Sequence, residues 1–246
     1  MGKKLYIILI SIIFMSYFSL SEDVNQCNFY PVKPKLPYYY GQFLIDRFEY
    51  ILNKDNDFNY EMTAWYGGDY RRIWLELEGE HNFNKNLGKI ENGDLLFGKL
   101  ISPFWDIRAG IGYVSLYNGK VYNDKKMILI GFKGLAPYRF EIDTNLRLTD
   151  NGNVYGDFEA EYDLFITQRL VLQPRFDTTF SFKNIPNIDI YSGVNNFDFS
   201  LRLRYEFKRE FAPYVGLNYS IKIGNARKAS EENESLFIFT GIRAWF

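Results

Sequence analysis

The chain has 246 residues, and its 29 Lys and Arg residues nearly balance its 30 Asp and Glu residues. This balance gives no indication of a nucleic-acid partner or of a strongly acidic partner. A single Cys excludes an internal disulfide and a thiolate metal cluster built from one chain. The aromatic content of 19% favours strands over helices.

The first residues have the features of a targeting segment. Lys3 and Lys4 precede an apolar run over residues 5–18, and two serines flank Leu20. Residues 1–21 are therefore predicted to be a secretory signal peptide, with a membrane anchor as the alternative. Residues 22–41 contain three prolines and are expected to form a flexible periplasmic leader before one folded domain, residues 42–246.

The folded domain shows apolar and polar residues that alternate with a period of two. Such alternation is typical of strands that have one apolar and one polar side. Twelve strands are predicted, at residues 42–52, 58–66, 70–82, 94–101, 107–116, 127–133, 138–149, 154–164, 169–182, 197–207, 214–223 and 236–246.

The clearest hairpin spans residues 138–164. Phe140, Leu146 and Leu148 lie on one side of its first strand, and charged residues alternate with them. A turn cluster at residues 150–153 separates this strand from a second strand with the same alternation. A soluble sheet would bury the apolar side, whereas a membrane barrel would turn it outward to lipid.

The connections and the last strand favour the membrane barrel. Short connections alternate with longer polar loops, which are expected at residues 84–93, 118–125, 183–196 and 224–234. The last strand ends on Phe246, in the manner of bacterial outer-membrane barrels. The predicted fold is therefore an all-β, antiparallel transmembrane β-barrel of about 12 strands. A secreted sandwich or lipocalin-like barrel is the alternative, but it does not account for these features together.

Several strings along the predicted barrel occur together in one known family. They are Ala64-Trp65-Tyr66-Gly67-Gly68-Asp69-Tyr70, Leu100-Ile101-Ser102-Pro103-Phe104-Trp105-Asp106, Gly134-Leu135-Ala136-Pro137-Tyr138, and residues 159–164, 168–170, 172–175, 201–206 and 209–214. In these strings the chain resembles the copper resistance protein B family of bacterial outer-membrane proteins. The resemblance implies a location in the cell outer membrane of a Gram-negative bacterium and a role in copper resistance and copper ion homeostasis. The implied partners are outer-membrane lipid, copper ions and periplasmic copper-handling proteins.

One segment departs from the family pattern. Family members often carry a Met- and His-rich segment before the barrel, and such side chains suit copper in both oxidation states. Residues 22–40 contain neither Met nor His, and only Cys27 offers a soft ligand there. The predicted barrel contains three further side chains of types that can bind copper, namely His81, Met62 and Met127. Both methionines are expected on the outward side. The resemblance therefore supports the location and the pathway better than it supports copper binding by this chain.

The charged side of the hairpin becomes the wall of the lumen if the apolar side faces outward. Pairing across the turn would place Glu141 opposite Glu161 and Asp143 opposite Glu159. Like charges in these positions destabilise a sheet unless cations compensate them. The predicted compensating network comprises Arg139, which would face Asp163, together with Arg175, Arg202 and Arg204.

This arrangement has two interpretations. The first is an ion-pair ladder that fills a narrow barrel and keeps it closed. The second is a cation site formed by Glu141, Asp143, Glu159 and Glu161. Carboxylates can hold Cu(II), but they select poorly for copper.

A second candidate metal site combines Glu78 and Glu80 with His81, the only histidine. The strand alternation places His81 on the side opposite Glu80, so a solvated rim is the alternative interpretation.

Catalysis has little support, because one histidine is available and no Gly-rich phosphate loop is present. The expected function is a non-enzymatic one in copper homeostasis, through binding or sequestering copper. The alternatives are a narrow channel or efflux partner with no copper site of its own, and an outer-membrane enzyme that depends on His81.

Overall fold

The computed structural model describes residues 38–52, 57–84, 87–118, 121–230 and 232–246. The predicted signal peptide lies outside the described residues, as does the predicted leader up to residue 37. Within the described residues, no helix has both the length and the apolar character that spanning a bilayer requires.

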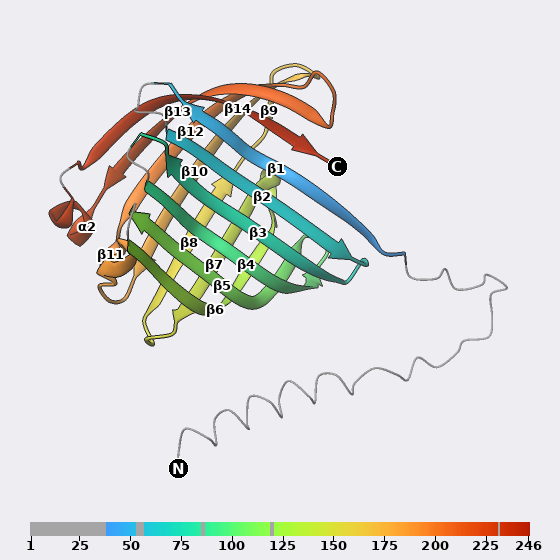
Figure 1. Cartoon of the computed structure of the whole chain (residues 1–246). Coiled ribbons are helices and arrows are strands. Elements are labelled where there is room, and N and C mark those ends of the chain that lie inside the picture. The colour runs from blue at the N-terminus through green and yellow to red at the C-terminus, as the bar shows by residue number, and fades with distance from the viewer. Residues whose placement is uncertain (1–37, 53–56, 85–86, 119–120, 231) are drawn as a thin grey trace, which may run out of the picture. The chain divides into compact units, whose positions relative to one another are not determined.

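Twelve long antiparallel strands form one continuous sheet in the described part of the chain (Figure 1). The pairings of β1 with β14 and of β8 with β10 join the ends of the sheet, so the sheet closes into a barrel. The predicted fold class is thereby confirmed. The long strands are β1 (Tyr40–Ile51), β2 (Asp57–Gly67), β3 (Arg71–Asn82), β4 (Leu87–Ser102), β5 (Trp105–Asn118), β6 (Val121–Ala136), β7 (Phe140–Thr149), β8 (Val154–Glu161), β10 (Leu170–Ser181), β12 (Asn196–Tyr205), β13 (Phe211–Lys222) and β14 (Glu234–Trp245).

Five short elements lie in the connections. They are η1 (Pro137–Arg139), β9 (Leu164–Phe165), η2 (Pro186–Ile188), β11 (Gly193–Val194) and α2 (Gly224–Ala229). We call the end of the barrel where β1 begins and β14 finishes the terminal end, and the opposite end the loop end. The two longest connections at the loop end contain η2 and α2 (Figure 1).

Two of the four predicted long loops are wrong. β4 begins at Leu87 and β6 at Val121, so most of residues 84–93 and 118–125 pair as strands. In β4 a register shift between Ile90 and Gly93 interrupts the alternation, and such a bulge hides a strand from a period-two pattern. In β6 residues 123–126 are polar, yet each of them pairs with β5. The connections at the loop end are consequently shorter than the sequence indicates.

The hairpin of β7 and β8 sets the orientation of the two faces. Leu146 and Leu148 lie on the outer face and are 44% and 45% exposed, whereas Arg147 between them points inward and is buried. The other strands follow the same rule, so an apolar outer surface surrounds a charged interior. This is the opposite of a soluble sheet and is typical of a transmembrane barrel.

The last residue helps to close the barrel. The backbone N–H of Phe246 donates to the carbonyl of Phe43, and the N–H of Phe43 donates to the carbonyl of Phe246. The two rings are stacked with their centroids 6.5 Å apart. The terminal aromatic residue therefore extends the pairing between β14 and β1.

Replacement of Phe246 by Ala should weaken this closure. We expect the free energy of unfolding to fall by about 0.5–1.5 kcal/mol, because the stacked contact with the Phe43 ring is lost. The folded fraction at increasing urea, followed by gel mobility of unheated samples in detergent, measures the change. Phe165→Ala, at an exposed position of the β8–β10 connection, is the control. Equal urea midpoints for the two variants would contradict the closing role of Phe246.

Candidate functional site in the barrel lumen

Arg175 of β10 is the centre of the first group of charges in the lumen. Its guanidinium contacts Glu61 Oε2 at 2.9 Å, Glu159 Oε2 at 2.8 Å and Asp177 Oδ1 at 2.9 Å, and Glu161 Oε1 lies 3.2 Å away. Glu61 belongs to β2, which is not a neighbour of β10 in the sheet. The Arg175 side chain therefore crosses the lumen. As the strand register predicts, it also reaches Glu159 on the adjacent β8.

Further arginines extend this group around the barrel. Arg47 of β1 contacts Glu61 at 2.6 Å and also binds Glu78 of β3. Arg202 of β12 binds Asp46 at 3.0 Å and lies 3.9 Å from Glu161. Arg243 joins through Asp46, and Arg204 joins through Gln173, which also binds Glu161. The remaining members contact Arg202 or Arg204: they are Glu49, Asp163 and Glu206. We call the whole set the Arg175 cluster.

Arg108 of β5 is the centre of a second group. It contacts Glu76 of β3 at 2.5 Å and also binds Asp143 of β7. Lys133 of β6 lies 3.0 Å from Asp143 and 3.6 Å from Glu76. Arg147 pairs with Asp94 and Asp157, both at 2.7 Å, and the amide of Asn145 bridges Asp157 to Asp143. We call this set the Arg108 cluster.

The two clusters are separate. Among the described residues, no side-chain hydrogen bond or ion pair joins a member of the Arg175 cluster to a member of the Arg108 cluster. Each cluster compensates its own buried charges, as charges in a low-dielectric environment require.

The register predicted for the hairpin of β7 and β8 is the observed one. Glu141 pairs with Glu161 and Asp143 with Glu159. Asp143, Glu159 and Glu161 are compensated by cations of other strands, and Arg139 is not among these cations. Glu141 is exposed and does not belong to the cavity lining. Arg139 lies in the exposed turn η1, and within the described residues no ion pair to it is found. The prediction that it faces Asp163 is wrong, because β7 starts at Phe140 and β8 ends at Glu161.

The His81 site is divided by the barrel wall. His81 pairs with Phe58 on the outer face, and its ring makes an edge contact with Phe83 at 4.7 Å. Glu78 and Glu80 line the interior instead. The three residues therefore do not converge on one point. In the described part of the chain, no group of three His, Cys, Asp or Glu side chains has a geometry that could hold a metal ion.

Met127 lies on the inner face, which corrects the prediction that it faces outward. It is buried, and the hydroxyl of Tyr155 donates to its sulfur at 3.1 Å. Ile185 and Ile188, from the connection that contains η2, cover this apolar patch of the inner wall. The connection thus folds into the barrel at the loop end and narrows the opening.

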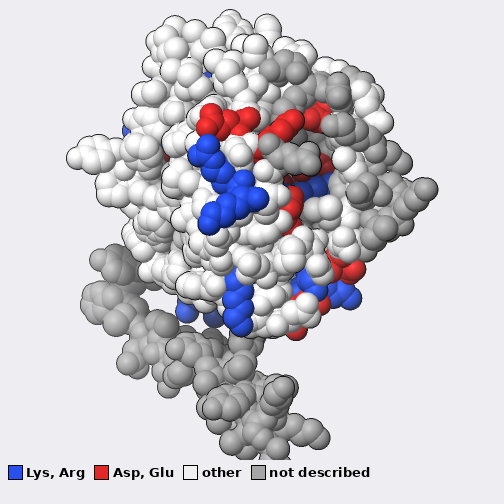
Figure 2. All heavy atoms as spheres, turned by 90° about the vertical axis from the view of Figure 1, so that its left-hand side faces the viewer, with Lys and Arg blue, Asp and Glu red and all other residues white. Residues whose placement is uncertain are grey.

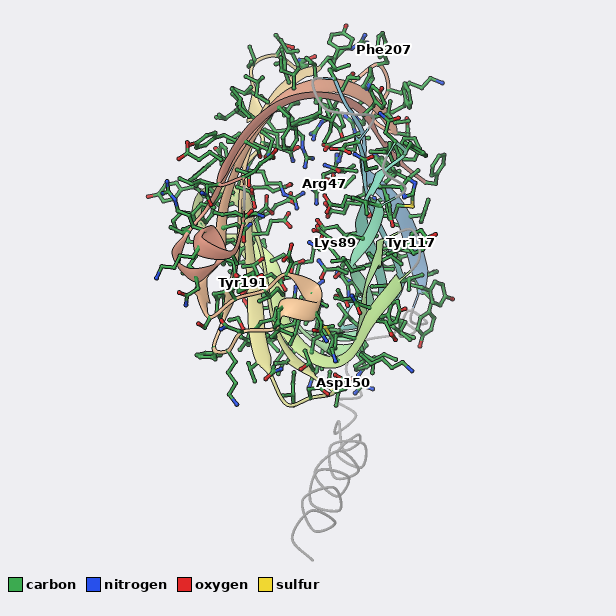
Figure 3. The ribbon with its side chains drawn as sticks, turned by 60° about the vertical axis from the view of Figure 1, so that its left-hand side comes forward. Arg47, Lys89, Tyr117, Asp150, Tyr191 and Phe207 are labelled. Carbon is green, nitrogen blue, oxygen red and sulfur yellow. The ribbon has the colours of Figure 1, made fainter. Side chains whose placement is uncertain are left out.

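A cavity of about 730 Å³ occupies the lumen and opens at the loop end. Its described lining contains 15 acidic residues and seven basic residues, so its field favours cations. Acidic side chains are visible around and within the hollow at this end (Figure 2). Arg47 and Lys89 lie at the lumen, whereas Tyr117 is on the outside of the wall (Figure 3).

Three arginines that hold the interior together were not predicted from the sequence, namely Arg47, Arg108 and Arg147. A signal was present for two of them. Arg108 alternates with Ile107 and Ala109, and Arg147 alternates with Leu146 and Leu148, so the strand pattern places both side chains inside once the apolar side faces out. In β1 a register shift between Ile45 and Arg47 removes that signal.

Comparison with known proteins identifies the family. The family model described as copper resistance protein B precursor (CopB) matches residues 39–246. The chain belongs to the copper resistance protein B family. Copper resistance protein B of Escherichia coli is 31% identical over 208 residues, which cover 82% of this chain and 68% of that protein. The copper resistance protein B homolog of Pseudomonas syringae pv. tomato is 31% identical over 211 residues, with 83% and 69% covered.

Among solved structures, the NanC porin has a similar fold. It aligns with a TM-score of 0.50 at 10% sequence identity and covers 82% of this chain and 98% of the porin chain. At this identity the similarity concerns the fold alone. The copper resistance family member described here thus has the barrel fold of outer-membrane proteins.

Loss of Arg175 should destabilise the barrel strongly. Arg175→Met leaves the buried carboxylates around it uncompensated, and we expect the free energy of unfolding to fall by about 3–5 kcal/mol. Arg175→Lys should lower the free energy of unfolding almost as much, because an ammonium group cannot reproduce the forked contacts that a guanidinium makes.

Urea midpoints of the purified protein in detergent measure this effect. Arg227→Met is the matched control, because Arg227 is half exposed and lies 3.9 Å from Glu234. The control should change the free energy of unfolding by less than about 0.5 kcal/mol. A stable Arg175→Met variant would show that the Arg175 cluster is not needed for the fold.

Proposed function

We propose that this chain is a non-enzymatic protein of the outer membrane that acts in copper homeostasis and retains copper ions in its acidic lumen. The observation that carries the proposal is the excess of carboxylates along a lumen that opens to one side, in a member of the copper resistance protein B family. The apolar outer face would contact outer-membrane lipid. The terminal end would then face the periplasm, where periplasmic copper-handling proteins could receive the ions.

The retention we propose is electrostatic and of modest selectivity. Asp177 of β10 and Asp198 of β12 lie directly opposite one another on the cavity wall. Asp177 is paired with Arg175, whereas Asp198 accepts a hydrogen bond from the amide of Asn196. Two facing carboxylates, of which only Asp177 contacts an arginine, attract a divalent cation. Carboxylate oxygens can bind Cu(II), but they also accept other divalent ions.

The absence of an enzymatic role is part of the same proposal. His81 faces outward among aromatic rings, away from the carboxylates of the lumen. A base in that position cannot act on a molecule inside the barrel. Copper homeostasis without catalysis therefore agrees best with the positions of the polar side chains.

Neutralising the facing carboxylates should weaken copper retention. For the double variant Asp177→Asn and Asp198→Asn we expect Cu(II) affinity to fall about tenfold, because two nearby negative charges are removed. Equilibrium dialysis of the purified barrel with Cu(II) measures this, and Zn(II) should bind within a similar range. Asp150→Asn, at an exposed turn outside the cavity, and His81→Ala should leave the affinity unchanged.

A deletion strain tests the cellular role. It should be more sensitive to copper than the parent strain, and the native gene should restore growth better than the double variant does. Unchanged copper tolerance of the deletion strain would contradict a role in homeostasis. Copper binding that depends on His81 instead would contradict retention in the lumen.

A further inference from the structure

We propose that the boundary between the two ion-pair clusters is a path for cations through the barrel, and that Lys133 is its gate. The proposal goes beyond copper retention, because it concerns the passage of small cations such as K⁺ and does not require a copper site. It rests on the depth of the cavity, on the composition of its walls and on the position of Lys133.

The cavity extends through most of the barrel. At the loop end its lining includes Ala226 of α2 and Glu234, the first residue of β14. At the other extreme its lining includes Lys133, which lies only three residues before β6 finishes at Ala136. β6 finishes at the terminal end, so one continuous space reaches from the open mouth almost to the opposite turns.

Carboxylates form much of the wall of this space in its part nearer the terminal end. Glu61, Glu78 and Glu159 belong to the Arg175 cluster, and Glu76 and Asp143 belong to the Arg108 cluster. The two clusters meet on β3, where Glu76 and Glu78 are alternate residues, and between β7 and β8, where Asp143 pairs with Glu159. No side-chain hydrogen bond or ion pair between described residues joins the two clusters, as noted above. Rings of carboxylates are the device by which cation channels favour cations over anions.

The side chains at the boundary between the two clusters are more exposed to solvent than the side chains at the cluster centres. The central guanidiniums are shielded, with 2% of the side chain exposed for Arg175 and none for Arg108. The carboxylates of the walls are more open, up to 29% for Glu159. Water therefore reaches the boundary but not the centres of the clusters, and a hydrated cation would follow the water.

Lys133 occupies the deep end of the path. Its ammonium lies between Asp143 and Glu76 and 5.8 Å from the centroid of the Trp74 ring, and the side chain is 37% exposed. An ammonium on a flexible stem can leave one partner for another, whereas the buried arginines are held by forked contacts. Asp143 and Glu76 keep Arg108 as a partner when Lys133 moves. Lys133 can therefore move without breaking the Arg108 cluster, and in its present position it closes the path by charge and by volume.

Planar-bilayer recordings of the purified full chain in KCl test the proposal. The wild type should show a small, cation-selective conductance. Lys133→Met keeps the length of the side chain and removes its charge, so the conductance should rise about tenfold and remain cation-selective. Lys133→Arg should keep the path closed to at least the extent of the wild type.

Lys125→Met is the matched control. Lys125 lies on the same strand and on the same inner face as Lys133, but it pairs with Asp150 and lies outside the cavity. This variant should conduct like the wild type. Gel mobility of unheated samples shows whether each variant is folded, and Lys133→Gln replaces Lys133→Met if the latter is not.

Three outcomes would overturn the proposal. A folded Lys133→Met variant that conducts no better than the wild type excludes Lys133 as the gate. Anion selectivity excludes a path lined by the carboxylates. The absence of any conductance in the wild type and in all variants excludes a path altogether. Each of these outcomes leaves copper retention by Asp177 and Asp198 untouched, since that is measured by dialysis.

Discussion

The structure depends on one constraint: the barrel encloses a lumen, and many of the side chains that point into this lumen are charged. A soluble β-protein buries apolar side chains and leaves charges in water, whereas here the apolar side of every strand is directed outward. The buried guanidiniums of Arg108, Arg147 and Arg175 therefore occupy much of the interior, beside small apolar clusters such as the one around Met127. Desolvating a guanidinium costs several kcal/mol, so each of them must be met by carboxylates in good geometry. The positions of the inward charged side chains follow from this requirement.

The same constraint bears on the proposed role, because the interior fits the binding or conduction of cations better than it fits catalysis. An enzyme needs a group whose proton or lone pair is available to a substrate. The inward carboxylates and arginines mostly hold one another, and the histidine is on the outside of the wall. What remains available is the electrostatic potential of the surplus carboxylates, which acts on any small cation and distinguishes poorly between metals. The family relationship to copper resistance proteins and the general affinity of such a lumen for cations are thus compatible.

Much of this architecture could be predicted from alternation alone. The parity of Leu146 and Arg147 separates the outer from the inner face, and the turn at residues 150–153 sets the pairing of Glu141 with Glu161. Parity also places His81 outside. Contacts across the lumen could not be predicted, since the alternation says nothing about which distant strand a long side chain reaches. The contact of Arg175 with Glu61 depends on the tilt and closure of the barrel. A bulge also cannot be predicted from alternation, and for this reason the first part of β4 was predicted as a loop. The first part of β6 was predicted as a loop because its residues are mostly polar.

The division of the charges into two clusters has a consequence for the order of assembly. The Arg108 cluster is built from β3 to β8, one uninterrupted part of the chain, so it can form as these strands pair. The Arg175 cluster joins residues that are far apart in sequence, by 114 positions for Arg175 and Glu61 and by 197 for Arg243 and Asp46. Contacts of such separation are slow to form, because a long loop must close first. The barrel therefore contains a half that can mature while its termini are still unpaired, and a half whose long-range ion pairs, such as those of Arg175 with Glu61 and of Arg243 with Asp46, exist only after β1 and β14 have met.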